Sequence, residues 1–129
     1  MDIAIIGGGV CGLTAAINLA KLKSSHIDIY EKNFKVARKL LASGNGRCNI
    51  TNLNVSGDYY NNPRFVSNII LGYSSMVSYL NNLGLMLTEP DECGRVYPIS
   101  YHSSTVLDCF YNSFNKSYTI IINNTSIDK

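Results

Sequence analysis

The segment "IAIIGGGVCGLTAAINLA", residues 3 to 20, constrains the fold of this chain more than any other. It begins with a short β-branched run, Ile3–Ile6, that ends directly in glycines, which is typical of a buried parallel strand. Apolar residues then recur at helical spacing over 10–22, and a second β-branched strand is predicted over Ile27–Tyr30. Strand, helix and strand within about 30 residues have the length of one βαβ unit. The sequence therefore predicts an α/β fold in which the strand from Asp2 to Ile6 is parallel to the strand over Ile27–Tyr30.

Three glycines at the junction of strand and helix match the pattern G-x-G-x-x-G: Gly7, Gly9 and Gly12. In such a junction the first glycine makes a tight turn, the second lets a pyrophosphate approach the backbone, and the third lets helix and strand pack closely. The helix N-terminus presents unpaired N–H groups to the phosphates. Glu31 follows Gly12 by 19 residues, where an acidic residue accepts hydrogen bonds from a ribose diol. The pattern predicts an adenine-dinucleotide site that disfavours NADP; a glycine turn that serves only packing is the alternative.

A second segment, "RKLLASGNGRCNITN" at residues 38 to 52, is rich in polar donors beside two glycines. The first motif alone does not choose between FAD and NAD. A flavin needs donors beyond the first turn, whereas an NAD-binding Rossmann protein has no need of residues 42–51, so we expect this segment to form the second wall of an FAD site. The expected cofactor residues beyond the first motif are Lys32, Arg38, Lys39, Ser43, Gly44, Gly46, Arg47, Cys48, Asn49 and Thr51. For Lys32, which lies with Lys35 in a basic cluster, a solvated face is the favoured interpretation.

The segments "GGGVCGLTAAINLA", "EKN", "RKLLASGNGRCNITN" and "GRVYPIS" together resemble a family of bacterial flavoproteins. These are the aminoacetone-oxidase-like or bile-acid-inducible-reductase (BaiN)-like FAD-binding oxidoreductases. The resemblance implies FAD in a glutathione-reductase-like fold, NAD(P)H as a reductant, and an enzyme of the oxidoreductase class. It also implies that Glu31 meets the adenosine ribose, that residues 38–51 lie along the cofactor, and that 118–127 form the strand that reaches the adenine.

Members of that family are several times longer than this chain of 129 residues. They carry an inserted substrate domain and a C-terminal segment that returns to the flavin, and neither is expected here. We therefore expect residues 1–129 to be the N-terminal part of an FAD/NAD(P)-binding domain. One alternative is a non-catalytic truncated remnant, or one chain of a split flavoprotein whose second chain supplies the missing half. A further alternative is an NAD-binding Rossmann protein.

The remaining segments predict further helices and short strands. We expect helices over 34–41, 63–71, 74–83 and 103–114, and strands over 85–88, 95–97 and 118–122. Gly72 separates the second and third of these helices, and Gly84 ends the third. Ser103 or Ser104 is expected to cap the last helix.

Composition and cysteine usage exclude several classes of protein. A net charge of +2 is too small to indicate nucleic acid or an anionic membrane surface, and no apolar run approaches the roughly 18 residues of a membrane span. The cysteines lack any C-x-x-C pair, so we expect free thiols in a reducing cytoplasm and no metal site. Cys48 beside Arg47 is a candidate catalytic thiol, but a small residue packed beside the flavin is the favoured interpretation. No catalytic residue is assigned.

Overall fold

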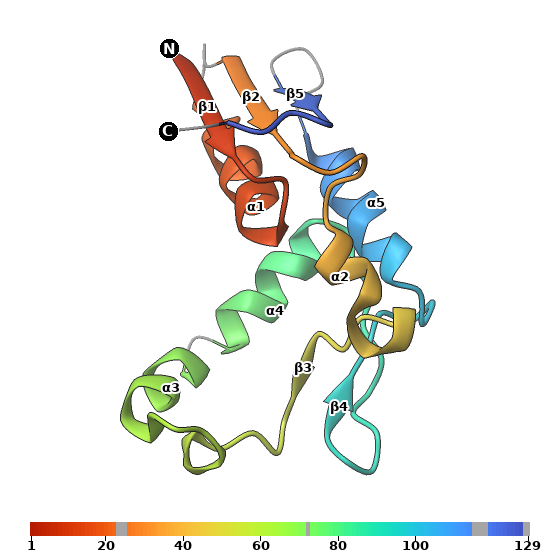
Figure 1. The fold of residues 1–129 in the computed structure, drawn as a ribbon. Coiled ribbons are helices and arrows are strands. Elements are labelled where there is room, and N and C mark those ends of the chain that lie inside the picture. Colours follow the sequence, from red (N-terminus) through yellow and green to blue (C-terminus); the bar gives the residue numbers. More distant parts are fainter. Residues whose placement is uncertain (23–25, 72, 115–118, 128–129) are drawn as a thin grey trace.

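The computed structural model describes residues 1–22, 26–71, 73–114 and 119–127, and its central feature is a parallel sheet (Figure 1). The strand order is β1-β2-β5, with bounds β1 Asp2–Ile6, β2 His26–Tyr30 and β5 Thr119–Ile122. β1 pairs with β2 from Asp2–His26 to Ile6–Tyr30, and β2 pairs with β5 in the same parallel sense. The predicted α/β fold with its first two strands parallel is confirmed.

One face of this sheet is covered by two helices, α1 (Val10–Leu19) and α5 (Ser103–Ser113). Ile27 and Ile29 of the central strand are fully buried and belong to one apolar cluster with Leu13 of α1 and Phe110 of α5. Paired residues of parallel strands point to the same side, so Ile3 and Ile5 of β1 join this face. The opposite face is open: Ile6 is 61% exposed and Ile120 is 48% exposed.

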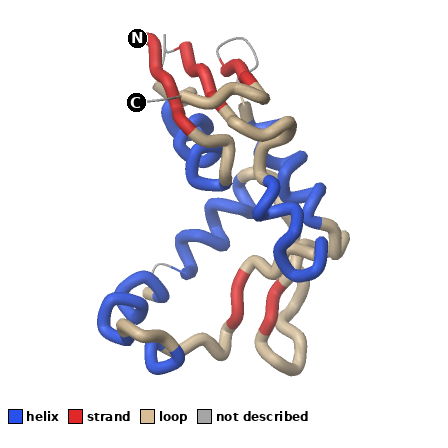
Figure 2. The backbone as a smooth tube through the Cα atoms, viewed as in Figure 1, coloured by secondary structure: helices blue, strands red, loops and turns tan. Residues whose placement is uncertain are grey.

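The middle of the chain leaves the sheet and forms a second region. Its elements are α2 (Arg38–Ala42), the 3-10 turn η1 (Ser43–Gly46), β3 (Thr51–Asn52), the 3-10 turn η2 (Gly57–Tyr59), α3 (Pro63–Ile70), α4 (Tyr73–Asn82) and β4 (Arg95–Val96). β3 and β4 form a two-stranded antiparallel sheet. Figure 2 shows the strands in two groups, the parallel ones near both termini and the short pair at the far end of the molecule.

Several boundaries differ from the predictions. The first helix ends at Leu19, before the predicted 22. The helix expected over 34–41 begins only at Arg38, because Ala37 has a left-handed backbone (φ +57°) and donates its N–H to the Gly8 carbonyl at 2.8 Å. The strand expected over 85–88 is reduced to a single bridge between Leu87 and Pro98. The break at Gly72 lies outside the described residues.

The predicted serine cap of α5 is wrong. His102 precedes the helix without a side-chain cap, and the Ser103 hydroxyl donates instead to the Leu41 carbonyl at 2.9 Å. This bond ties α5 to α2, so a tertiary contact has replaced the local one. Gly84 does end α4 as predicted, with φ +86° and an N–H bond to the Asn81 carbonyl.

Candidate functional site

The loop between β1 and α1 is built by glycines with different local requirements. Gly7 has φ +103° and donates its N–H to the Tyr30 carbonyl at 2.8 Å, so the chain turns sharply while still paired to β2. A Cβ on Gly12 would collide with the Gly7 carbonyl oxygen. A Cβ on Gly9 would meet no atom within 4 Å, and Gly9 has an ordinary φ of −76°. Nothing in the described chain therefore requires glycine at position 9, where the missing side chain leaves room for a ligand.

The carboxylate of Glu31 is buried, with 7% of the residue exposed, and it is held by three donors. One oxygen, Oε2, accepts the Gly8 N–H at 2.9 Å. The other, Oε1, accepts the Asn33 N–H at 2.9 Å and also the Asn33 side-chain amide. The backbone N–H of Asn33 is the main reason that the pKa of Glu31 lies below its ordinary value, against the opposing effect of burial. The carboxylate is thus ionised at neutral pH, and one of its roughly four acceptor positions is left on Oε2.

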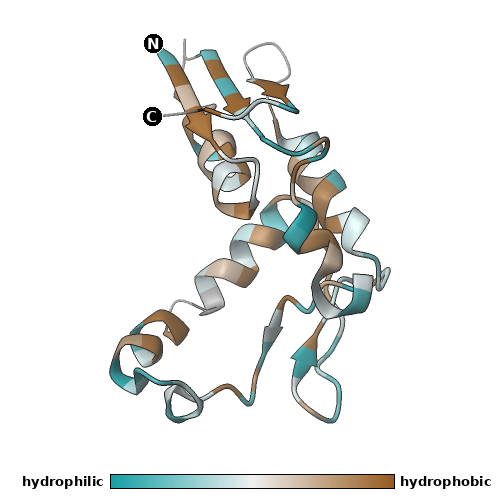
Figure 3. Cartoon of the chain, viewed as in Figure 1, coloured by the Kyte–Doolittle hydropathy of each residue, from teal (hydrophilic) through white to brown (hydrophobic). Residues whose placement is uncertain are grey.

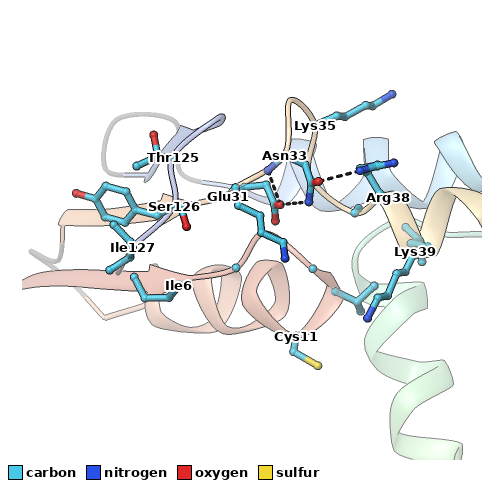
Figure 4. Close-up of a pocket in the computed structure, with 17 residues that line it drawn as sticks. Ile6, Cys11, Glu31, Asn33, Lys35, Arg38, Lys39, Thr125, Ser126 and Ile127 are labelled. Atoms are coloured by element: carbon cyan, nitrogen blue, oxygen red, sulfur yellow. Dashed lines mark hydrogen bonds between the residues drawn. The ribbon is translucent and has the colours of Figure 1, made fainter. Parts of the chain in front are cut away.

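A pocket of about 610 Å³ lies in front of the glycine loop (Figure 4). It brings together six of the predicted cofactor residues: Gly7, Gly9, Glu31, Lys32, Arg38 and Lys39. The Asn33 side chain connects two of them, since it also accepts a bond from the Arg38 guanidinium at 2.8 Å. Figure 4 shows this chain of contacts from Glu31 through Asn33 to Arg38 along one side of the pocket.

The pocket carries an excess of positive charge. Lys32, Lys35, Arg38 and Lys39 line it together with a single carboxylate, that of Glu31. Within the described residues the ion pairs are His26–Asp28 and Arg95–Asp91, so none of these four cations forms an ion pair, although the charge of Lys32 helps to lower the pKa of Glu31. A pocket with this balance favours an anionic ligand such as a pyrophosphate.

The wall opposite the cations comes from the C-terminal segment and was not predicted residue by residue. Thr125, Ser126 and Ile127 line the pocket there. The Thr125 N–H donates to the Glu31 carbonyl and the Asn124 N–H to the Asn33 carbonyl, both at 3.0 Å. The signal in the sequence was the change from an apolar strand to "NNTS", because ligands bind at the carboxyl ends of parallel strands.

A second, more apolar hollow of about 470 Å³ adjoins the first. Ser43, Cys48 and Asn49 line it from the second predicted motif. Its other walls are residues of α1, α4 and α5 and the nearby Ile50: Thr14, Ile50, Met76, Tyr79, Leu80, Val106 and Phe110. Val10, Lys39 and Leu40 border both hollows. The two predicted motifs therefore meet at this shared border.

The remaining predicted residues line neither hollow. Gly44 has φ +55° and would bring a Cβ to 2.8 Å from the Asn49 nitrogen, and Gly46 has φ +80°, so both shape the loop. The Arg47 guanidinium lies over the Tyr97 ring at 5.5 Å. Thr51 belongs to β3 and pairs with Val96. Their cofactor contacts, like those of the residues that do line the hollows, stay a prediction.

Cys48 has the features of a packed thiol. It is 3% exposed, and its burial raises the pKa of the thiol while a bond with Ser43 opposes that effect. A raised pKa keeps the sulfur protonated and a poor nucleophile. In the part of the chain that the structure describes, no group of three or more His, Cys, Asp or Glu residues could hold a metal ion. No described helix is long and apolar enough to cross a membrane.

Comparison with known proteins gives related sequences and a matching fold. The chain is 35% identical over 111 residues to the 3-dehydro-bile acid delta(4,6)-reductase of Clostridium scindens, which covers 82% of this chain and 27% of that protein. It is also 37% identical over 97 residues to the ribosomal RNA dihydrouridine synthase of Haemophilus influenzae. That match covers 72% of this chain and 24% of the Haemophilus protein. The crystal structure of Thermovibrio ammonificans THI4 has a TM-score of 0.61 and 19% identity, and covers 95% of this chain and 38% of that one.

These matches confirm the Rossmann-like fold and the family resemblance read from the motifs. The chain spans about a quarter of the length of the curated relatives it matches. The family model for the HI0933-like protein Rossmann domain matches residues 1–129, the whole of the sequence. The chain therefore belongs to the family of HI0933-like proteins, through a match to the model of the family's Rossmann domain.

Proposed function

We propose that this chain is the FAD-binding part of a flavin-dependent oxidoreductase, and that the pocket in front of the glycine loop holds the ADP half of the cofactor. The observation that carries the proposal is the placement of Gly9, which the fold does not require to be glycine, in one pocket with a buried ionised Glu31 and four cations that form no ion pair among the described residues. The hydroxyl groups of a ribose can donate to the Glu31 carboxylate, and the anionic oxygens of a pyrophosphate match the four cations.

The N-terminus of α1 supports a pyrophosphate at this place. The helix has no side-chain cap at Gly9 and no acidic residue in its first turn. Its first N–H groups therefore lack an acceptor within the helix, and their partial positive charge faces the pocket lined by Val10 and Cys11. Lys39, on the shared border of the hollows, is placed to neutralise the same anion.

The second hollow supports a proposal for the flavin end of FAD. Its lining is mainly apolar, which suits a flat aromatic ring, and Ser43 and Asn49 supply polar groups. Bound FAD would supply hydride-transfer chemistry, and the chain's own residues would bind and orient it. Gly44, Gly46, Arg47 and Thr51 would act by holding the loop that carries Ser43, Cys48 and Asn49.

The wider function follows from the relatives as a proposal. The Clostridium relative is named a reductase, and a relative from Pyrococcus horikoshii, 31% identical over 108 residues, is named an L-aspartate oxidase. Both names denote redox enzymes, which favours an oxidoreductase that takes electrons from NAD(P)H or a reduced substrate. Since the chain spans only about a quarter of these proteins, we propose that further polypeptide completes the site. All four cysteines are free, and Cys11 and Cys93 are exposed, which supports a reducing cytoplasm as the compartment.

A competition titration tests the cofactor and the half of it that the chain recognises. The purified chain is titrated with FAD, and then with ADP, FMN and NAD+ as competitors, while flavin fluorescence is recorded. If the pocket holds the ADP half, ADP displaces FAD and FMN does not. NAD+ that binds more tightly than FAD would replace the proposal by the NAD-binding alternative, and the absence of binding by all four ligands would reject a nucleotide site.

A further inference from the structure

Asn33 lines the pocket in front of the glycine loop and contacts three of its walls through different groups. Its backbone N–H and its side-chain amide donate to Oε1 of Glu31, directly after β2. Its side-chain oxygen Oδ1 accepts a bond from Nη1 of Arg38, the first residue of α2, at 2.8 Å. Its backbone carbonyl accepts the Asn124 N–H of the C-terminal segment at 3.0 Å. Figure 3 shows hydrophilic residues at the start of the loop after β2 and at the start of α2, the two places that Asn33 joins.

The side-chain amide of Asn33 has a single orientation that satisfies both charged neighbours. The amide nitrogen faces the Glu31 carboxylate, which only accepts hydrogen bonds, and the amide oxygen faces the Arg38 guanidinium, which only donates them. With the amide reversed, neither bond could form. Hydrogen bonds with one charged partner are also stronger than those between neutral groups. The amide is therefore held firmly between an anion and a cation.

Arg38 is exposed, yet its guanidinium has two defined contacts. It donates to Asn33, and it lies over the Phe34 ring at 5.6 Å. These contacts restrict a long side chain that would otherwise sample many rotamers. Because a guanidinium carries five N–H donors, donors remain for an anionic ligand in the pocket that Arg38 lines.

Glu31 and Arg38 carry opposite charges in one pocket, but they do not pair with each other. Neither belongs to an ion pair within the described residues. Oε1 of Glu31 instead accepts both donors of Asn33, and Oε2 accepts the Gly8 N–H and keeps one free acceptor position. A guanidinium pairs best with a carboxylate through two parallel bonds, one to each oxygen, and such a pair would take up that free position.

We propose that Asn33 is a positioning residue of the nucleotide site: its amide holds Glu31 for a ribose hydroxyl and Arg38 for the pyrophosphate, and prevents these two residues from pairing with each other. An amide suits this task because it donates and accepts without a charge of its own, whereas a carboxylate in its place would repel Glu31. The inference rests on the proposed function, since the ligand it concerns is the ADP half of FAD.

A comparison of ADP with 2′,3′-dideoxy-ADP tests this assignment, because the second nucleotide keeps the pyrophosphate and lacks both ribose hydroxyls. Isothermal titration calorimetry of the purified chain gives the two dissociation constants, and their ratio reports the bond between the ribose and Glu31. The wild-type chain should prefer ADP by about tenfold or more, the effect of one charge-assisted bond. Arg38→Ala should weaken the binding of both nucleotides by about tenfold and leave the preference unchanged.

Asn33→Ala removes the amide and keeps the backbone bonds to Glu31 and Asn124. Both nucleotides should bind less tightly to this variant, and the preference for ADP should largely disappear, because Arg38 turns to Glu31. The double variant Asn33→Ala/Arg38→Ala should regain the preference, since no guanidinium then occupies the carboxylate. Asn33→Ser, whose short hydroxyl cannot span both partners, carries the same expectations and replaces Asn33→Ala if that variant does not fold.

Lys35 supplies the matched control. It lines the same pocket and carries the same charge as Arg38, but Figure 4 shows its side chain pointing away from Glu31. Asn33→Ala/Lys35→Ala should therefore remain without the preference for ADP. This variant separates the removal of Arg38 from the general loss of one positive charge.

The other outcomes overturn the proposal. A preference that survives in Asn33→Ala would remove Asn33 from the positioning of Glu31. A preference that is lost there and does not return with Arg38→Ala would leave Asn33 only a part in the shape of its loop. Its return with Lys35→Ala as well would make the effect one of overall charge. A wild-type chain that binds neither nucleotide, or that does not distinguish them, would contradict the proposed function itself before any variant is compared.

Discussion

Glu31 accepts the backbone N–H of Gly8 at 2.9 Å, so the residue expected to hold the ribose also fixes the glycine loop in place. The bond joins the end of β2 to the loop that follows β1. A second link through Ala37, whose N–H donates to the Gly8 carbonyl at 2.8 Å, holds the same glycine from the other side. The loop is therefore held in place by residues that line the pocket.

Replacing Glu31 by alanine should lower both FAD affinity and stability. The buried N–H of Gly8 and the half-buried N–H of Asn33 would lose their acceptor, which costs about 1–3 kcal/mol of the free energy of unfolding. FAD binding should weaken by about a further 1.5–3 kcal/mol, from the loss of the charge-assisted bond between a ribose hydroxyl and the free acceptor position on Oε2. Urea unfolding and FAD titration measure the two effects separately. Unchanged FAD affinity in a folded variant would remove Glu31 from the ribose site.

Two glycine variants separate a ligand requirement from a packing requirement. Gly9→Ala should leave the free energy of unfolding nearly unchanged, because its Cβ meets no described atom, and should weaken FAD binding by about tenfold or more. Gly12→Ala should destabilise the chain by about 1–3 kcal/mol, because its Cβ collides with the Gly7 carbonyl. Thermal unfolding with and without FAD distinguishes them. A Gly9→Ala chain that binds FAD normally would contradict the position given to the pyrophosphate.

Stability should depend on the ionisation of Glu31 in acid. Its pKa lies below the ordinary value of 4.5, mainly because of the Asn33 N–H, so the folded state favours the carboxylate. A lowered folded-state pKa gives stability that is present above the unfolded value and is lost as the pH falls from that value through the folded pKa. The difference in free energy of unfolding between wild type and Glu31→Gln should be constant above about pH 5 and shrink below it. A difference that grows in acid would mean that folding raises the pKa of Glu31 and does not lower it.

The cysteines should report where the cofactor lies. Cys11 and Cys93 are exposed and should react quickly with a thiol reagent, whereas Cys48 is buried with a raised pKa and should react slowly. Cys11 lines the first pocket and Cys93 lines neither hollow, so of these two exposed cysteines FAD should slow the labelling of Cys11 only. Mass spectrometry of the labelled peptides gives each rate. If FAD slowed the labelling of Cys93 but not that of Cys11, the cofactor site would lie away from the glycine loop.

The part of this structure that the sequence predicts well is the part with local determinants. The βαβ unit follows from β-branched runs, helical spacing and glycines within one short segment, and the placement of Glu31 at the end of β2 follows from it. Three features depend on distant partners and left little local signal. Ser103 bonds to the Leu41 carbonyl, and Arg47 stacks on Tyr97. The two-residue strand β3 is too short to show the alternation of apolar and polar residues that marks a strand. The C-terminal wall of the pocket depends on how β5 pairs with β2.

The last prediction concerns the activity of the chain by itself. The second hollow is open to solvent, so a flavin bound there would be wet and its reactivity weakly controlled. We expect the purified chain to bind FAD weakly and to oxidise NAD(P)H slowly or not at all. The rest of the Clostridium scindens relative, added as a second chain or joined as one polypeptide, should raise both bound flavin and turnover. The measurements are the FAD content after gel filtration and the rate of NAD(P)H oxidation. Stoichiometric FAD with rapid turnover by the monomeric chain would show that these residues suffice for the activity.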